Sequence, residues 1–305
     1  GWEKSVRSYR LEEHTDIIIT GSNSKMLSGE LSTLIGGRYQ EIHVQSLSYQ
    51  EFLCFHELED NDESLWKYVN YGGLPGLIQT GLEDEDLVWD YIRGVYHTVM
   101  LKDIIERHNI RNITFLNTLL RYFSDTIGKL TSLNNICKYL KSQGQDVAVK
   151  SISAYHNYFK EVYLLDSVGR YDIHGKKLLE SNEKLYFGDV GIRNLIAGGE
   201  RVGDIEKILE NIVYRQLLYM GYSISVGQLK VGEVDFVCTK NNERVYVQVT
   251  YLVTSPETEE REFSCLENIK DNYPKYVISM TPFVKKSDRA GITHLGLREF
   301  LKNGF

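Results

Sequence analysis

The chain has 305 residues, of which 42% are hydrophobic and 25% are charged, and its formal net charge is −7. These proportions are ordinary for a globular protein of two or three domains, each with enough apolar material for a core. An acidic chain of this kind does not bind phosphate groups over its whole surface, so only a local basic patch could serve nucleic acid.

Cysteine spacing and hydropathy indicate the redox state of the thiols and whether a membrane segment is expected. The chain has four cysteines, none of which belongs to a C-x-x-C pair: Cys54, Cys137, Cys238 and Cys265. This spacing favours neither a zinc knuckle nor a disulfide framework, so we expect reduced thiols and a cytoplasmic protein. No apolar run is long enough to span a bilayer and no signal peptide opens the chain, so no membrane partner is expected.

The N-terminal region is expected to alternate helices and strands. Residues 2–11 have an amphipathic pattern typical of a helix. Residues 16–20 contain three consecutive isoleucines, which predicts a strand buried on both faces, as in a parallel sheet. A second strand is expected to run through Val44. The helix after it has Ser48 as its N-cap and Glu51 in the reciprocal capping-box position.

The middle of the chain is expected to be helical, with a strand pair at its end. Apolar periodicity predicts helices over residues 83–108, 115–123, 132–142 and 150–163. Two strands are expected to follow, over residues 163–171 and 178–187. Helix, turn, helix and β-ribbon in this order are typical of a winged helix.

A winged helix would read nucleic acid with its second helix and its wing. The polar candidates on that helix are Lys150, His156 and Lys160, and Lys177 would add a contact from the wing. The set is only weakly basic. DNA binding and a role in packing or protein contacts therefore both stay open.

The C-terminal region is expected to form an α/β layer structure. Apolar spacing predicts a helix that ends at Gly221, and three strands follow it. Strict alternation puts Glu233 and Asp235 on one face of the second strand, and Gln248 and Thr250 on one face of the third. A later helix, a strand over residues 275–280 and a short final helix complete the expected fold.

This layout resembles the core of the PD-(D/E)xK nuclease superfamily. The resemblance implies that Glu210, Asp235 and Gln248 are catalytic, and that Glu210 and Asp235 hold Mg²⁺. Thr250 stands where the family has its lysine. We therefore expect a nuclease-like scaffold without activity, with a metal-dependent nuclease acting on DNA or RNA as the alternative.

The first residues resemble the end of an AAA+ ATPase core. The similarity lies in Gly1-Trp2-Glu3, in a strand that ends in T-G-S-N-S, and in the segments G-R-Y and L-S-x-x-E-F-L. It implies that Ser22 or Asn23 acts as sensor 1 near the γ-phosphate, and that Arg38 is a phosphate-sensing or finger arginine.

The phosphate-binding motif of such an ATPase is not in the sequence. G-x-x-x-x-G-K-[ST] does not occur, and the nearest look-alike, residues 126–131, lacks the first glycine and the preceding apolar strand. The acidic Walker B pair is absent too. We therefore expect the P-loop part to lie upstream, so that ATP and Mg²⁺ would bind only together with that part.

Taken together, the ordered segments resemble a prokaryotic family of AAA+-type predicted ATPases with a C-terminal domain of unknown function. The resemblance implies a multidomain α/β protein in four parts: residues 1–47 from the ATPase core, 48–113 as a helical lid-like region, 114–188 as the winged helix and 189–305 as the nuclease-like sandwich. The main hypothesis is the C-terminal portion of such an ATPase. The alternatives are a nuclease and a non-catalytic module that binds nucleic acid or protein, and the oligomeric state is left open.

Overall fold

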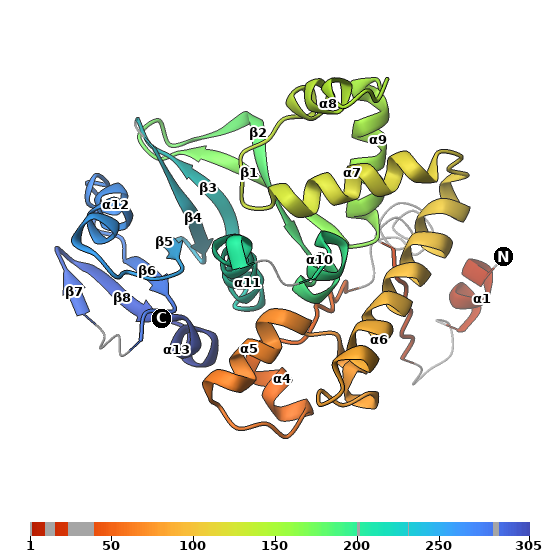
Figure 1. Cartoon of the computed structure of the whole chain (residues 1–305), viewed down its shortest axis with the longest axis horizontal. Helices are drawn as coiled ribbons and strands as arrows, with labels where there is room; N and C mark the ends of the chain where they lie inside the picture. The colour runs from red at the N-terminus through yellow and green to blue at the C-terminus, as the bar shows by residue number, and fades with distance from the viewer. Residues whose placement is uncertain (1, 10–15, 24–39, 200–201, 231, 283–286) are drawn as a thin grey trace.

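One mixed β-sheet organises the described part of the chain, which comprises residues 2–9, 16–23, 40–199, 202–230, 232–282 and 287–305 of a computed structural model (Figure 1). The sheet has eight strands in the order β2-β1-β3-β4-β5-β6-β8-β7. In chain order they are β1 (Leu165–Asp172), β2 (Lys177–Phe187), β3 (Ser223–Gln228), β4 (Glu233–Lys240), β5 (Glu243–Thr250), β6 (Lys275–Ser279), β7 (Ser287–Arg289) and β8 (Ile292–Gly296).

Helices cover both faces of the C-terminal part of this sheet. They are α11 (Ile205–Tyr219), which precedes β3, α12 (Pro256–Glu267), which links β5 to β6, and α13 (Leu297–Asn303) after β8. Phe236 belongs to the core cluster that contains the buried residues of α11, whereas Val237 belongs to the cluster around Phe263 of α12. Consecutive strand residues point to opposite faces, so α11 and α12 lie on opposite sides of the sheet.

The expected order of elements in the C-terminal region is confirmed. Strands β3, β4 and β5 are antiparallel neighbours, and β5 pairs in parallel with β6 after the α12 crossover. Asn241 and Asn242 join β4 to β5 with φ values of 48° and 64°. Two positive φ values are what a two-residue type I′ hairpin requires, which explains why Asn is tolerated at both positions.

The other described helices lie before β1 in the chain or between β2 and β3. They are α1 (Trp2–Tyr9), α4 (Tyr49–Phe55), α5 (Asp62–Tyr71), η1 (Pro75–Gln79), α6 (Glu85–Thr98), the π-helical η2 (Val99–Glu106), α7 (Ile113–Thr126), α8 (Leu133–Ser142), α9 (Val149–Glu161), α10 (Val190–Ala197) and the short η3 (Val202–Asp204). The capping box predicted for α4 is present, since Ser48 Oγ accepts from the Glu51 N–H and the Glu51 carboxylate accepts from the Ser48 N–H at 2.9 Å. Ser132 caps α8 in the expected way. In the part of the chain that the structure describes, no helix is both long and apolar enough to cross a bilayer.

The β1–β2 hairpin connects the helical region to the sheet. Strand β1 pairs with β2 along most of its length, with a register shift between Val168 and Arg170, and pairs in parallel with β3 through Arg170, Tyr171 and Asp172. The last residues of β2 stay paired with the start of β1 and also contact α11, where the Phe187 N–H donates to Asn211 Oδ1 at 2.7 Å. The sheet therefore contains strands from both sides of the boundary predicted between residues 188 and 189.

Two strands expected near the N-terminus are not present. Residues 16–20 and the segment before Val44 have no strand conformation, and the side chains of Ile18 and Val44 are 88% and 86% exposed. A strand needs a neighbour to pair its backbone N–H and C=O groups. Among the described residues no strand lies beside either segment, so the isoleucine run is left without the two-sided cover that its composition suggested.

Candidate functional site

Three carboxylates converge on the ammonium group of one buried lysine. Lys184 Nζ lies 2.9 Å from Glu210 Oε1, 2.9 Å from Asp235 Oδ1 and 3.0 Å from Glu233 Oε1. Its side chain is 1% exposed. The ammonium donates hydrogen bonds to Glu210 and Asp235 and forms an ion pair with Glu233.

Three elements bring these residues together. Glu210 lies on α11, Glu233 and Asp235 alternate on one face of β4, and Lys184 comes from the end of β2, where the strand lies against α11. Tyr186 follows on the same face of β2, and its hydroxyl donates to Glu210 Oε1 at 2.6 Å. The convergence of Glu210 with Asp235, which the alternation pattern predicted, is therefore found in the structure.

Burial and the neighbouring charges shift the pKa values of Lys184 and Glu210. Burial alone would lower the pKa of Lys184, but the nearby carboxylates outweigh it, Asp235 most strongly, and raise that pKa well above its usual value. Burial also raises the pKa of Glu210, to about 7, and the charge of Asp235 adds to this effect, while Lys184 and Tyr186 oppose it. The cluster has three carboxylates for one ammonium, and burial opposes the charged form of Glu210 while Lys184 and Tyr186 favour it.

Gln248 supports Asp235 and does not face the ammonium. Its Oε1 accepts from the Asp235 N–H at 3.2 Å, and its Nε2 donates to Glu262 Oε2 at 3.1 Å. Asp235 Oδ2 accepts in turn from the Val249 N–H at 3.0 Å. The amide oxygen of Gln248 is therefore engaged with the backbone, and the residue fixes the orientation of Asp235.

The loop before α8 closes the cluster at Glu210. Gly128 has a φ of +70°, and a Cβ at this position would lie 2.7 Å from Glu210 Oε2. The Gly128 N–H donates to the Leu185 carbonyl at 3.2 Å. A side chain at residue 128 would therefore collide with the carboxylate, and the backbone conformation also favours glycine.

The cluster suits a cation in charge and in donor type. Glu210 and Asp235 supply the hard oxygen ligands that Mg²⁺ prefers, and they are not fully neutralised by one ammonium. In the described part of the chain, however, no three His, Cys, Asp or Glu side chains are arranged as a ready metal site. Lys184 occupies the point on which the carboxylates converge, so a divalent cation held by Glu210 and Asp235 would compete with it for their oxygens.

Lys184 is the residue that the sequence did not place in the site. The sequence placed it in the wing of the expected winged helix, 26 positions before Glu210 and 51 before Asp235. The available signal was its position directly before the apolar residues L-Y-F, all of which are buried, within the same expected strand. Charged residues inside such a strand are rarely buried without a partner.

The nucleotide-sensing candidates are only partly described. Asn23 is buried and Ser22 is exposed, while Arg38 lies outside the described residues. Their proposed contact with a phosphate therefore stays a prediction.

The nucleic-acid candidates do not form one patch. Lys150 and Lys160 are exposed at opposite ends of α9, whereas His156 is buried on the inner face of that helix. Lys177 pairs with Asp172 at the end of β1 away from α9. The seven residue steps from Leu165 to Asp172 correspond to about 23 Å of extended strand.

Family models match two parts of the chain. Residues 1–53 match an AAA domain, and residues 62–201 match a domain of unknown function, DUF8612. The second match runs from α5 to the end of α10 and thus includes the β1–β2 hairpin that contains Lys184. The chain is accordingly related to the AAA-type ATPases, with a domain of unknown function after the AAA part.

Relatives define the family more closely. A protein of Haemophilus influenzae described as uncharacterized is 36% identical over 283 residues, which are 92% of this chain and 69% of the relative. The chain belongs to the same family as this protein. An uncharacterized protein of Methanocaldococcus jannaschii is 29% identical over 88% of the chain, which spans 63% of that relative.

One solved structure aligns with part of the chain. Protein VC1899 from Vibrio cholerae covers 63% of this chain with 50% of its own length, at 13% identity and a TM-score of 0.25. A likeness of this size carries no argument about fold or function.

Proposed function

We propose that the lysine–carboxylate cluster hydrolyses phosphodiester bonds with a divalent cation, as the nuclease-like part of an AAA-type ATPase. The position of Lys184 supports this proposal most directly. Thr250 leaves the third strand without the lysine of the nuclease pattern, and Lys184 brings an ammonium group to the same carboxylates from another strand. The missing lysine was the reason to expect an inactive scaffold, so that reason no longer holds.

Each residue of the cluster has a role that follows from its position. Glu210 and Asp235 would hold Mg²⁺ or Mn²⁺, which when bound polarises a phosphoryl oxygen and acidifies a bound water. Lys184 would donate to the anionic oxygens of the substrate phosphate. The side chain of Glu233 is 35% exposed, more than its partners, so it is the carboxylate that solvent and substrate reach first.

The remaining parts of the chain are proposed to act around this centre. ATP and Mg²⁺ would bind the complete AAA part, with Ser22, Asn23 and Arg38 near the γ-phosphate. Helices α8 and α9 with the β1–β2 hairpin would serve as a winged helix. Its partner would be either DNA or a second protein. DNA would be contacted by Lys150, Lys160 and Lys177.

The test is cleavage by the purified chain in the presence of Mg²⁺ or Mn²⁺. Plasmid DNA, linear duplex, single-stranded DNA and RNA are offered, with EDTA as the metal-free arm. We expect cleavage that Asp235→Asn and Glu210→Gln abolish and that Lys184→Met lowers by about 100-fold or more, as for the loss of one charge-stabilising donor. Glu243→Gln on the exposed start of β5 is the matched control and keeps full activity.

The opposite result has a clear meaning. If no nucleic acid is cut under any of these conditions while Asp235→Asn and Lys184→Met both unfold at lower denaturant concentration, the cluster is a structural ion-pair core. The family would then use this module for binding, and the nuclease proposal would be withdrawn.

A further inference from the structure

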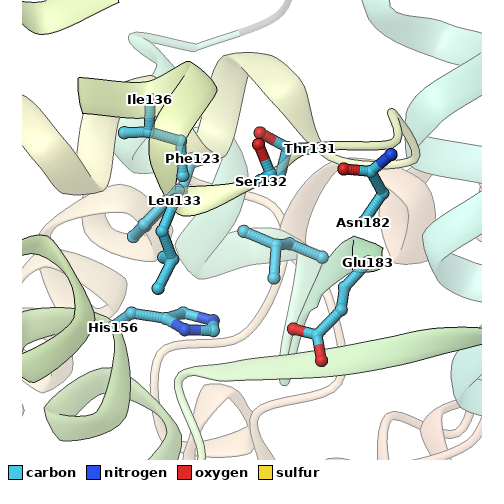
Figure 2. Close-up of a pocket in the computed structure, with 9 residues that line it drawn as sticks. Phe123, Thr131, Ser132, Leu133, Ile136, His156, Asn182 and Glu183 are labelled. Carbon is cyan, nitrogen blue, oxygen red and sulfur yellow. The ribbon is translucent and has the colours of Figure 1, made fainter. Parts of the chain in front are cut away.

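A second site lies on the other side of β2. A cavity of about 260 Å³ opens between α7, α8, α9 and the end of β2. Its lining combines four apolar side chains with five polar ones: Phe123, Leu133, Ile136 and Leu185, and Thr131, Ser132, His156, Asn182 and Glu183. Figure 2 shows the imidazole of His156 and the carboxylate of Glu183 extending toward the same space from opposite sides.

The charge of the lining selects the kind of ligand. Glu183 is the only lining residue with a permanent charge, and no lysine or arginine lines the cavity. Burial, with a smaller effect from nearby Lys160, lowers the pKa of His156 to about 4 although the charge of Glu183 opposes the shift, so the imidazole is neutral at physiological pH. Phosphate and carboxylate ligands are disfavoured here, whereas a neutral or cationic ligand with N–H donors is favoured.

Two polar side chains of the lining, Ser132 and His156, already have hydrogen-bond partners, whereas the Glu183 carboxylate is exposed and open to a ligand. The Thr131 and Glu183 backbones exchange two hydrogen bonds, of 2.9 and 3.0 Å. Ser132 Oγ accepts from the Asn135 N–H, and His156 Nε2 bonds Ser167 Oγ at 3.0 Å. The Glu183 carboxylate makes no hydrogen bond or ion pair within the described residues, and its two oxygens can accept two parallel N–H bonds.

The size and shape of the cavity suggest a small flat molecule. Sites for drug-sized ligands begin at about 300 Å³, so this cavity suits something smaller. Apolar side chains would cover the faces of a ring, and the polar groups would meet its edge. Proteins recognise single unstacked bases in this way, by apolar or aromatic contact with the ring and hydrogen bonds to its edge.

We propose that this cavity binds a guanine base, with the ring between the apolar side chains and its adjacent N1–H and N2–H groups donating to the Glu183 carboxylate. The base has two sources, a free guanine nucleoside or an unpaired guanine in a nucleic-acid strand. The recognition chemistry is the same for both, because the phosphates would stay outside the cavity. Guanine binding here does not require that the lysine–carboxylate cluster cleaves nucleic acid.

The test is calorimetric titration of the full chain with guanosine, inosine and adenosine. Guanosine presents both N–H donors, inosine only N1–H, and adenosine no ring N–H, so the expected order of affinity is guanosine, inosine, adenosine. Glu183→Ala is expected to weaken guanosine binding about tenfold or more, in line with the loss of a bidentate base contact. Asp146→Asn removes a carboxylate charge from the exposed α8–α9 loop and is expected to bind like the wild type.

Two further measurements distinguish the source of the base and test the cavity itself. Short single-stranded oligonucleotides with one guanine among adenines, and all-adenine controls, separate a strand-borne base from a free nucleoside. Leu133→Phe reduces the cavity without touching Glu183 and should also weaken binding. Equal affinity for guanosine and adenosine would overturn the role of Glu183, and no saturable binding of nucleoside or strand at millimolar concentration would overturn the site.

Discussion

Glu183 and Lys184 are consecutive residues of β2, and they face two different sites. Lys184 donates to Glu210 and Asp235 on one side of the strand, while Glu183 lines the cavity on the other. Thr131 pairs with Glu183 through the backbone and lines the same cavity, and Gly128, three residues earlier, lies against Glu210. One strand and one loop therefore contribute to both sites.

This shared strand predicts energetic coupling between the sites. A ligand that draws Glu183 into the cavity shifts the backbone that holds Lys184, and so changes the competition between Lys184 and a divalent cation. We expect 1 mM guanosine to change the dissociation constant of Mn²⁺ by about fivefold or more, and Mn²⁺ to change that of guanosine by the same factor. Titrations of each ligand with and without the other measure both factors. Identical constants in all four titrations would contradict the coupling.

Replacing Lys184 tests what holds the cluster together. Lys184→Met leaves three carboxylates facing one another without a cation, and removing one partner of a buried ion pair costs about 3–5 kcal/mol. Urea denaturation at pH 7 should show this loss, and Mn²⁺ should raise the unfolding temperature of the variant more than that of the wild type. Lys270→Met, at an exposed position after α12, is the control and should change neither quantity. A variant as stable as the wild type would mean that the carboxylates relax away from one another.

Alanine substitutions at Gly128 and Gly144 distinguish the cost of backbone strain from the cost of steric contact with Glu210. Both have positive φ values, 70° and 78°, but a Cβ meets Glu210 only at residue 128 and meets nothing within 4 Å at residue 144. The strain of a left-handed conformation is about 1–2 kcal/mol for each alanine. We expect Gly128→Ala to destabilise the chain by about 1 kcal/mol more than Gly144→Ala because the carboxylate must move. Equal losses of unfolding free energy would show that Glu210 adjusts at no cost.

Alternation along β4 predicted that Glu233 and Asp235 share a face, and the resemblance to the nuclease core added Glu210 and Gln248, of which Glu210 reaches the cluster. The start of α4 could also be predicted locally, because Ser48 and Glu51 form a capping box within four residues. The lysine could not be predicted in the same way, because its strand reaches the cluster only through the bend of the β1–β2 hairpin and the packing of β2 on α11. The strand predicted from the isoleucine run at residues 16–20 was wrong because a local pattern can favour a strand without supplying a neighbouring strand to pair with.

Thr250 offers a test of the position where the nuclease pattern has its lysine. The residue is 2% exposed, and its hydroxyl has no hydrogen-bond partner within the described residues. A buried unpaired hydroxyl costs about 1–3 kcal/mol, and valine has nearly the same shape. Thr250→Val should therefore raise the free energy of unfolding by about 1 kcal/mol in urea titrations and leave cleavage unchanged. A loss of stability would show that the hydroxyl forms a bond in solution, for example through a buried water.

His156 predicts a distinct pH dependence of stability. Its pKa in the folded chain is about 4, lowered from 6.5 by burial, so between pH 6.5 and 4 the unfolded chain binds a proton that the folded chain does not. The contribution of this residue to stability is complete above pH 6.5 and is lost as the pH falls toward 4, by an amount on the order of 3 kcal/mol. In His156→Gln this part of the slope disappears, whereas His174→Gln in the exposed β1–β2 turn retains it. The test is the free energy of unfolding of wild type and variants measured from pH 7 to pH 4. Parallel curves for wild type and His156→Gln would show that the imidazole is solvated and titrates normally.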